Sequence, residues 1–386
     1  MIDPSLYEGR EQTLIKHFLF GKYLERFAII VGSWADAITY VDGFSGPWNT
    51  RSSKLEDSSF AIALAELRKA RDVLKRIKNK DLKLRCFFIE KDPTAYRKLE
   101  EFANLQRDVE IRTRNSELEG AVPEIGEFIR KGGRANFPFV FIDPKGWTGF
   151  ALNTIKPILA LRPCEVLINF QTGFIKRFVE METVQDEFVA LFGNEEFRDK
   201  VKGLKKDDRE QAMLDEYVRN LRAAGDFGFV CAAAVPRPES EKTHFHLIYA
   251  TRDPKGVEVF KDAEFKSLPV MLQAQAEAKK AKRVAKTGQM EMFASQDMHQ
   301  PRYLEGLRIR QLALAETAVE SAIRSQKRLT YDSAWAISLS HPLVWERDLK
   351  GWIQAWSEDW LKVDGLIGKE RVPKRGKGHI LKIREG

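Results

Sequence analysis

Three acidic residues stand where they could do chemistry together. Asp42, Glu90 and Asp143 each lie at the end of a short run rich in β-branched and aromatic residues. Such runs, bounded by glycine, proline or charged residues, predict buried strands. Because the carboxyl ends of parallel strands meet at one edge of a sheet, we expect these side chains to surround a common ligand there.

The first of these runs ends in a glycine-containing turn, Asp42-Gly43-Phe44-Ser45-Gly46. Glycine lets the backbone approach a nucleotide-like ligand without a clash from Cβ. We therefore assign Asp42, Gly43, Phe44 and Gly46 to cofactor binding. The alternative is that these glycines only bend the chain between a strand and a helix.

The second and third strand ends supply polar groups for the rest of such a cofactor. A carboxylate at Glu90, followed by Lys91, could accept two hydrogen bonds from ribose hydroxyls, as the acidic residue of dinucleotide-binding folds does. Asn115 and Ser116 end the third strand, where a polar side chain could meet an adenine amino group. The alternative for Glu90 is an ordinary turn carboxylate exposed to water.

The fourth strand ends in the most informative string, FIDPKGW at residues 141–147. It partly resembles the DPPY motif of amino-group methyltransferases, in which carboxyl and proline carbonyl oxygens accept hydrogen bonds from the target amine and an aromatic ring stacks on an extruded base. Asp143 and Pro144 match, Lys145 replaces the second proline, and Trp147 falls one position late. We predict Asp143, Pro144 and Trp147 as catalytic. Alternatively, Asp143 caps the next helix or faces a cofactor ammonium while Trp147 packs.

The elements that must position these residues alternate along the chain. Strand-like runs lie at residues 37–44, 84–92, 109–115, 137–146, 164–170, 228–237 and 243–252, with helical stretches such as 58–77 and 94–105 between them. Alternation of this kind predicts an α/β fold with a mostly parallel sheet. The last two runs flank a charged, proline-containing turn and predict an antiparallel hairpin. A Rossmann-like sheet with such a terminal hairpin is the class I methyltransferase arrangement.

A change of composition after residue 265 indicates further modules. We expect the Rossmann-like domain at residues 1–265, a helical linker region at 266–330 and a winged-helix-like module at 331–386. The linker region contains a basic helix at 274–286 and a mobile stretch at 288–301. Helical periodicity resumes at Tyr303, and from Trp335 we expect three helices, followed by strand-like pieces at 366–372 and 379–383.

The C-terminal turn is strongly basic. Residues 369–384 hold seven Lys or Arg side chains against the single Glu370. We assign Lys374, Arg375 and Lys377 to nucleic-acid binding, because a basic wing can lie along a phosphate backbone. A solvated basic tail is the alternative.

In the order of its strings, the chain resembles the three-Cys-motif partner (TcmP) family. The strings are a leading LIKH helix that ends in KYL, then YVDGFSGP, FFIEKD, FIDPKGW followed by LINF, and HFHLIYATRDPKG, across residues 14–265. The resemblance implies a class I methyltransferase fold, S-adenosylmethionine (SAM) as cofactor, and a three-Cys-motif or phage-type partner protein encoded nearby. In related folds the first helix can close over the methionine end of SAM, which makes Lys16 a candidate. The family supplies no established substrate.

Other patterns exclude several classes of site. The three cysteines lie far apart in apolar runs, and His244 and His246 have no third ligand at a suitable spacing, so we expect no metal. Ser45 lacks the spacing of a nucleophile elbow, and the GxGxxG pattern of NAD-binding folds is absent. The tryptophans at 345, 352, 356 and 360 have helical spacing, which favours packing.

The leading hypothesis is a SAM-dependent methyltransferase that acts on an amino group of a nucleic-acid base. The net charge of +8 favours an anionic partner. Because no 18-residue apolar run or signal-peptide pattern occurs, we expect a cytoplasmic protein without membrane contact. The alternative is a non-catalytic scaffold that binds SAM, nucleic acid or a partner protein.

Overall fold

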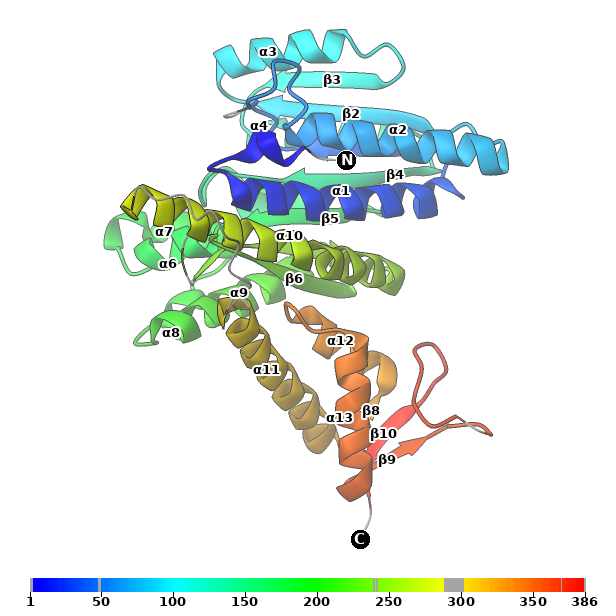
Figure 1. The fold of residues 1–386 in the computed structure, drawn as a ribbon. Helices are drawn as coiled ribbons and strands as arrows, with labels where there is room; N and C mark the ends of the chain where they lie inside the picture. Colours follow the sequence, from blue (N-terminus) through cyan, green and yellow to red (C-terminus); the bar gives the residue numbers. More distant parts are fainter. Residues whose placement is uncertain are drawn as a thin grey trace. The chain divides into compact units, whose positions relative to one another are not determined.

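A computed structural model describes residues 3–47, 50–238, 240, 242–287, 302–368 and 370–384 of the chain. Its contacts divide the chain into two compact units, Met1–Val230 with Ala234–Ala294 and Ser295–Gly386 with Cys231–Ala233. The first unit is built on one seven-stranded sheet in the order β3-β2-β1-β4-β5-β7-β6 (Figure 1). Its strands are β1 (Ala37–Asp42), β2 (Lys83–Glu90), β3 (Glu110–Asn115), β4 (Asn136–Ile142), β5 (Glu165–Phe170), β6 (Phe229–Pro236) and β7 (Thr243–Thr251).

The register of the strands confirms the predicted mostly parallel α/β sheet. Strands β3, β2, β1, β4 and β5 pair in parallel, whereas β7 runs antiparallel to β5, with Val166 opposite Ala250. Every residue of β1, β4 and β5 is buried. Helices on both faces explain why these strands are continuous apolar runs instead of alternating ones.

Two layers of helices cover the sheet. Helices α1 (Glu11–Gly32), α2 (Ser59–Lys78) and α10 (Pro254–Thr287) pack side by side on one face (Figure 1). Right-handed crossovers place α4 (Leu118–Lys131), α5 (Leu152–Leu159) and α9 (Lys206–Gly225) on the other face. The remaining helical elements of this unit are η1 (Pro4–Tyr7), α3 (Pro93–Asn104), α6 (Thr172–Phe178), η2 (Glu182–Val184), α7 (Gln185–Phe192) and α8 (Phe197–Val201).

Aromatic rings fix α1 against the centre of the sheet. Phe20 stacks on Phe141 with ring centroids 4.6 Å apart, and Tyr23 and Phe27 both contact the ring of Phe139. All five rings are almost completely buried. Because aromatic side chains bury the largest apolar areas, this contact sets where the polar residues of α1 meet the edge of the sheet.

The second unit comprises α11 (Arg302–Gln326), β8 (Arg328–Thr330), α12 (Tyr331–Ser340), α13 (Glu346–Asp359), β9 (Leu361–Asp364) and β10 (Ile380–Ile383). Its three strands form an antiparallel sheet in the order β8-β10-β9. Trp356 is buried between Trp352 and Trp360, and Arg324 lies 4.2 Å from the Trp360 ring. The tryptophan stripe therefore packs within this unit, as its spacing predicts.

Two expectations for this unit were wrong. The strand predicted at 366–372 lies earlier, because Asp364 pairs with Ile380 and Gly365 then turns the chain out of the strand with a φ of 90°. Ile367, which suggested the strand, is 79% exposed. The three helices also begin at Arg302 and not after Trp335, since α12 starts at Tyr331.

The stretch predicted to be a linker, 288–301, lies outside the described residues. None of the helices in the described ranges is long and apolar enough to cross a bilayer.

A buried polar cluster lies at the amino end of β5, away from the predicted site. The carboxyl group of Glu165 accepts hydrogen bonds from Tyr23 and from Thr251 at 2.9 Å, and the hydroxyl oxygens of Tyr23 and Tyr249 are 2.8 Å apart. Burial raises the pKa of Glu165 to about 6, although the hydroxyl donors oppose the shift. The charged form of Glu165 therefore costs more in the folded protein than in the unfolded one.

We predict that Glu165→Gln changes how stability depends on pH. Since the pKa of Glu165 is higher in the folded state, its contribution to stability falls as pH rises from about 4 through 6. Gln does not titrate, so only the wild type should lose this contribution. The free energy of unfolding of the variant minus that of the wild type should therefore be higher at pH 7 than at pH 4 by up to about 2 kcal/mol. Urea unfolding at both pH values measures this difference. A difference that does not vary with pH would contradict the shifted carboxyl.

Candidate functional site at the carboxyl edge of the sheet

The predicted site residues converge where the strand order reverses. β1 and β4 are neighbours, but the chain continues from β1 to β2 on one side and from β4 to β5 on the other. Ligands of open α/β sheets bind outside the carboxyl ends of the strands at such a point. Asp42 pairs in register with Phe141, which places Asp143 two residues farther along at the same edge.

Asp42 is fully buried at the end of β1 and holds the following loop. Its carboxylate accepts hydrogen bonds from the Ser59 hydroxyl at 2.7 Å, the Tyr40 hydroxyl at 3.0 Å and the Phe44 N–H at 3.1 Å. Burial raises the pKa of Asp42 to about 6; the Ser59 and Phe44 hydrogen bonds oppose this, and the nearby Asp143 charge adds to it. Ionised Asp42 thus depends on the three donors around it.

The turn after β1 is fastened to β2 by Ser45. The Ser45 hydroxyl donates to the Asp42 carbonyl at 2.9 Å and accepts from the Ile89 N–H at 3.2 Å. A Cβ on Gly43 would lie 3.0 Å from the Leu118 side chain, so this glycine permits close packing against α4. Phe44 and Gly46 are half-buried in the same turn. The Ser45 hydroxyl is buried and makes two hydrogen bonds within the protein. It therefore stabilises the turn, in agreement with the absence of a nucleophile-elbow pattern.

Glu90 lies beside the ends of β2 and β3 and is buried. One carboxyl oxygen accepts the Asp92 N–H at 2.6 Å, and burial is the main cause that raises the pKa of Glu90. The Glu90 carbonyl accepts from the Asn115 amide at 2.8 Å and from the Ser116 N–H at 3.2 Å. Glu90, Asn115 and Ser116 are therefore brought together, whereas the exposed Lys91 side chain forms an ion pair with Glu117.

Lys16 and Asp143 form an ion pair. The sequence marked both residues as candidates but did not predict their contact. The Lys16 ammonium contacts Asp143 Oδ2, and both side chains are largely buried. Asp143 Oδ1 accepts a hydrogen bond of 2.6 Å from the side-chain amide of Asn169, the penultimate residue of β5. Asn169 was not among the predicted residues, although its place at a strand end in LINF is the signal that could have found it. Both carboxyl oxygens of Asp143 are engaged.

Pro144 and Trp147 lie on the loop after β4 with different surroundings. The Pro144 carbonyl accepts from the Gln171 amide at 3.4 Å. The Trp147 ring lies between 5.2 and 5.3 Å from three phenylalanine rings of α6 and α7, and its N–H donates to Glu187 at 2.6 Å. Trp147 thus joins the loop to the segment after β5, as the packing alternative describes.

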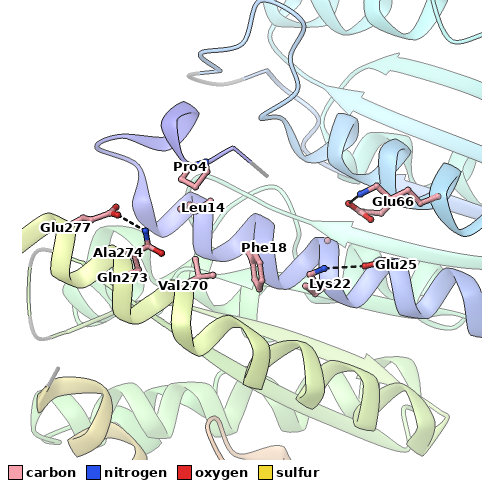
Figure 2. Close-up of a pocket in the computed structure, with 12 residues that line it drawn as sticks. Pro4, Leu14, Phe18, Lys22, Glu25, Glu66, Val270, Gln273, Ala274 and Glu277 are labelled. Atoms are coloured by element: carbon pink, nitrogen blue, oxygen red, sulfur yellow. Dashed lines mark hydrogen bonds and ion pairs between the residues drawn. The ribbon is translucent and has the colours of Figure 1, made fainter. Parts of the chain in front are cut away.

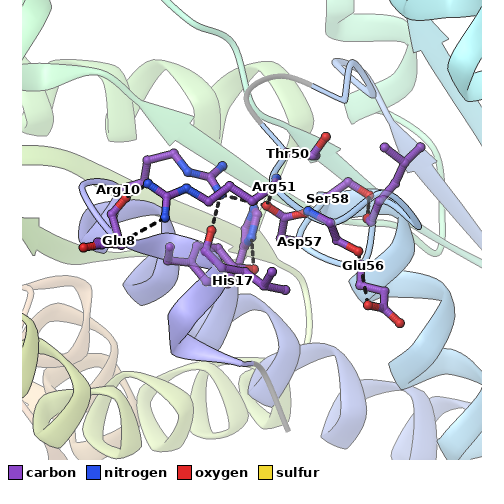
Figure 3. Close-up of polar contacts among 12 residues, drawn as sticks. Glu8, Arg10, His17, Thr50, Arg51, Glu56, Asp57 and Ser58 are labelled. Carbon is purple, nitrogen blue, oxygen red and sulfur yellow. Dashed lines mark hydrogen bonds and ion pairs between the residues drawn. The ribbon is translucent and has the colours of Figure 1, made fainter.

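A network at the chain's amino end fastens the loop between β1 and α2 (Figure 3). Buried Asp57 accepts hydrogen bonds from the Arg10 guanidinium at 2.7 Å and from the Arg51 and Ser52 N–H groups at 2.8 and 3.2 Å. Burial raises the pKa of Asp57, but these donors outweigh burial and hold it below its ordinary value. Arg51 also donates to the Glu8 carbonyl at 2.8 Å. The residues before α1 and the loop therefore form one unit.

A cavity of about 220 Å³ lies between α1, α2 and α10, apart from these residues (Figure 2). Apolar side chains of Leu14, Phe18 and Val270 line it, with charged residues at its rim such as Lys22 and Glu25, which form an ion pair. It contains none of the predicted site residues. Within the described ranges, no three His, Cys, Asp or Glu side chains form a group that could hold a metal ion.

No protein-family model matches the chain, and no curated protein matches its sequence. Among solved structures, the chain is similar to a loganic acid methyltransferase with S-adenosylhomocysteine (SAH), at 10% identity and a TM-score of 0.30 over 73% of this chain and 91% of that one. It is also similar to a proposed methyltransferase from Thermobifida fusca YX, at 11% identity and a TM-score of 0.32 over 65% and 84%. Both overlaps are too loose to carry an argument about this chain.

We predict that Asp57→Ala loosens the two segments that Asp57 joins. Loss of a buried carboxylate that accepts three hydrogen bonds leaves the Arg51 and Ser52 N–H groups without an acceptor and leaves Arg10 with only the Leu6 carbonyl, which raises the frequency of local opening. Amide hydrogen exchange should become at least about tenfold faster in residues 3–10 and 50–58 but not in β1 or β4. Asp72→Ala, at a side chain 77% exposed, is the control. Equal exchange in both variants would contradict the role of Asp57.

Proposed function

We propose that this protein is a SAM-dependent methyltransferase. The observation that carries the proposal is the meeting of Asp42, Glu90 and the Lys16–Asp143 pair at the point where the strand order of the seven-stranded sheet reverses. Open α/β sheets bind nucleotide-like cofactors there. The antiparallel β7 at the far side of β5 is the feature that favours a methyltransferase over a NAD-binding protein.

The donor set at this edge fits SAM. Glu90 would offer a buried carboxylate to ribose hydroxyls, and Asn115 and Ser116, which lie next to it, would face the adenine. The turn from Asp42 through Gly43, Phe44 and Gly46 would follow the methionine part, with Lys16 above it and Lys91 at the outer rim. Bound SAM would supply a methyl group on a positively charged sulfur. The residues of this chain would bind SAM, orient the acceptor and exclude water from the site.

The loop after β4 would receive the acceptor. Asp143 and Pro144 present oxygen atoms beside the expected position of the methyl group, and Trp147 forms one wall. Transfer of a methyl group to an amine needs mainly orientation of a lone pair towards the sulfonium, so no strong base is required. The acceptor class that best suits a DPPY-like loop is an exocyclic amino group of a nucleic-acid base.

The second unit supports a nucleic-acid acceptor. We propose that its order of helix, strand, two helices and two strands is a winged helix. The turn between β9 and β10 is held by hydrogen bonds from the Gly376 N–H to Asp332 and from the Lys374 N–H to His379, both 2.9 Å. Arg375 lies over the Trp335 ring, and Lys377 is exposed. This basic turn would contact phosphates.

Two further proposals concern partners and the alternative function. The TcmP resemblance favours a three-Cys-motif or phage-type partner protein in a mobile-element or defence system, in the cytoplasm. The alternative function is a scaffold that binds SAM or nucleic acid without catalysis, and the full engagement of Asp143 by Lys16 and Asn169 is the observation in its favour.

We predict that the purified protein binds SAM and SAH with micromolar affinity and that Glu90→Ala weakens both at least about tenfold. The reason is that hydrogen bonds to a charged acceptor contribute about 1.5–3 kcal/mol each. Isothermal titration measures the affinities. Glu101→Ala, which removes an exposed carboxylate of α3, is the control and should bind within about threefold of the wild type. Absence of SAM binding by the wild type would refute the proposed function.

We predict that joint replacement of Lys374, Arg375 and Lys377 by Ala weakens nucleic-acid binding and flattens its dependence on salt. Each lost phosphate contact lowers the slope of log K against log salt by about 0.9 for duplex DNA. Fluorescence anisotropy at several salt concentrations measures the slope. The control replaces Lys75, Arg76 and Lys78, three exposed residues of α2, and removes the same charge. An unchanged slope in the first variant would exclude the wing.

A further inference from the structure

Asn169 places an unused acceptor in the candidate site. Its side chain is 1% exposed at the carboxyl end of β5, and Ile168 pairs with Ile142, so Asn169 and Asp143 leave adjacent strands side by side. The Asn169 amide nitrogen donates to Asp143 Oδ1 at 2.6 Å. Its carbonyl oxygen is buried and has no hydrogen-bond partner in the described part of the chain. A buried acceptor without a donor is unfavourable in a folded protein, so its place in the structure needs an explanation.

The orientation of this amide is fixed by its neighbour. An ionised carboxylate only accepts hydrogen bonds, and Asp143 forms an ion pair with the Lys16 ammonium. Reversing the amide would place two oxygen atoms against each other. The nitrogen must therefore face Asp143, and the carbonyl oxygen lies about 2.3 Å from that nitrogen. The unpartnered oxygen is thus within about 5 Å of the Asp143 carboxylate.

On the basis of the proposed function, we propose that the Asn169 side-chain carbonyl, and not Asp143, accepts the hydrogen bond from the acceptor amine. Each Asp143 oxygen already accepts one hydrogen bond, from Lys16 or from Asn169, whereas the Asn169 carbonyl oxygen accepts none; we therefore assign Asp143 to positioning the Asn169 amide. The Pro144 carbonyl retains a second lone pair beside its bond to Gln171 and supplies the other acceptor.

This arrangement suits methyl transfer to an exocyclic amine. One N–H of the amine donates to Asn169 and the other to Pro144, which turns the nitrogen lone pair towards the methyl carbon. The nitrogen–carbon bond forms as the carbon–sulfur bond breaks, and the bonding electrons remain on sulfur, which becomes a neutral thioether. The extra proton then leaves the nitrogen for water. No further reactant is needed.

The test uses the full chain, tritiated SAM and single-stranded DNA and RNA probes that contain all four bases. Asn169→Ala should lower kcat/KM for methyl transfer by about a hundredfold while the SAM affinity, measured by titration, stays within about threefold. Asn136→Ala is the matched control. Asn136 is also buried on a strand of the sheet, but at the opposite edge and with both amide atoms bonded, and its replacement should leave transfer unchanged.

A double variant that exchanges the side chains of residues 143 and 169 distinguishes a positioning role of Asp143 from a loss of folding. Asp143→Asn combined with Asn169→Asp keeps one amide against one carboxylate and leaves an acceptor oxygen on residue 169. We expect this double variant to recover at least about tenfold of the transfer that Asp143→Asn loses alone. No recovery, with an unchanged thermal unfolding temperature, would overturn the assignment of Asp143 as a positioning residue.

The remaining outcomes distinguish the inference from the proposed function. Transfer by Asn169→Ala at the wild-type rate would overturn the inference and leave the proposed function standing. A loss of SAM affinity of tenfold or more in Asn169→Ala would assign the oxygen to the cofactor's ammonium group and also overturn it. A wild-type protein that binds SAM but methylates no probe would refute an acceptor role for Asn169, whereas failure to bind SAM would refute both.

Discussion

Buried carboxylates at the carboxyl edge of the sheet are the constraint on which the rest of the site depends. Asp42 and Glu90 end β1 and β2, Asp143 directly follows β4, and the charge of Asp143 helps to raise the pKa of Asp42. Carboxylates in such surroundings stay charged only if each has donors of its own. Ser59, the N–H groups of Phe44 and Asp92, and the Lys16 ammonium supply them. The turn after β1 and the Lys16 side chain of α1 meet this requirement.

The Lys16–Asp143 pair also explains why the aromatic packing of α1 matters for chemistry. Lys16 lies one turn before Phe20, whose ring stacks on that of Phe141 only two residues from Asp143. A rotation of α1 would break the ring contact and the ion pair together. The helix thus carries a charge to the site with the precision of a packed core, which a loop would not provide.

The sequence predicted most of the sheet because its strands are short apolar runs with clear boundaries. It also identified the strand ends that meet at the site, since parallel strands must present them at one edge. It did not predict the pairing of Lys16 with Asp143, which are 127 residues apart, or the role of Asn169, because no local pattern marks a polar residue whose partner lies on another strand. The misplaced strand after β9 has a local cause, since Gly365 ends β9 where apolar residues continue.

The Asp57 network couples the residues before α1 to the loop between β1 and α2. Arg10 and the loop between β1 and α2 share one buried carboxylate, so a ligand that orders this loop also stabilises the residues before α1. Coupling of this kind is reciprocal: whatever holds the chain's first residues in place must tighten the binding of that ligand by the same factor. A molecule that binds residues 3–10 would therefore act as an effector of any ligand that orders this loop, although it touches none of the strands.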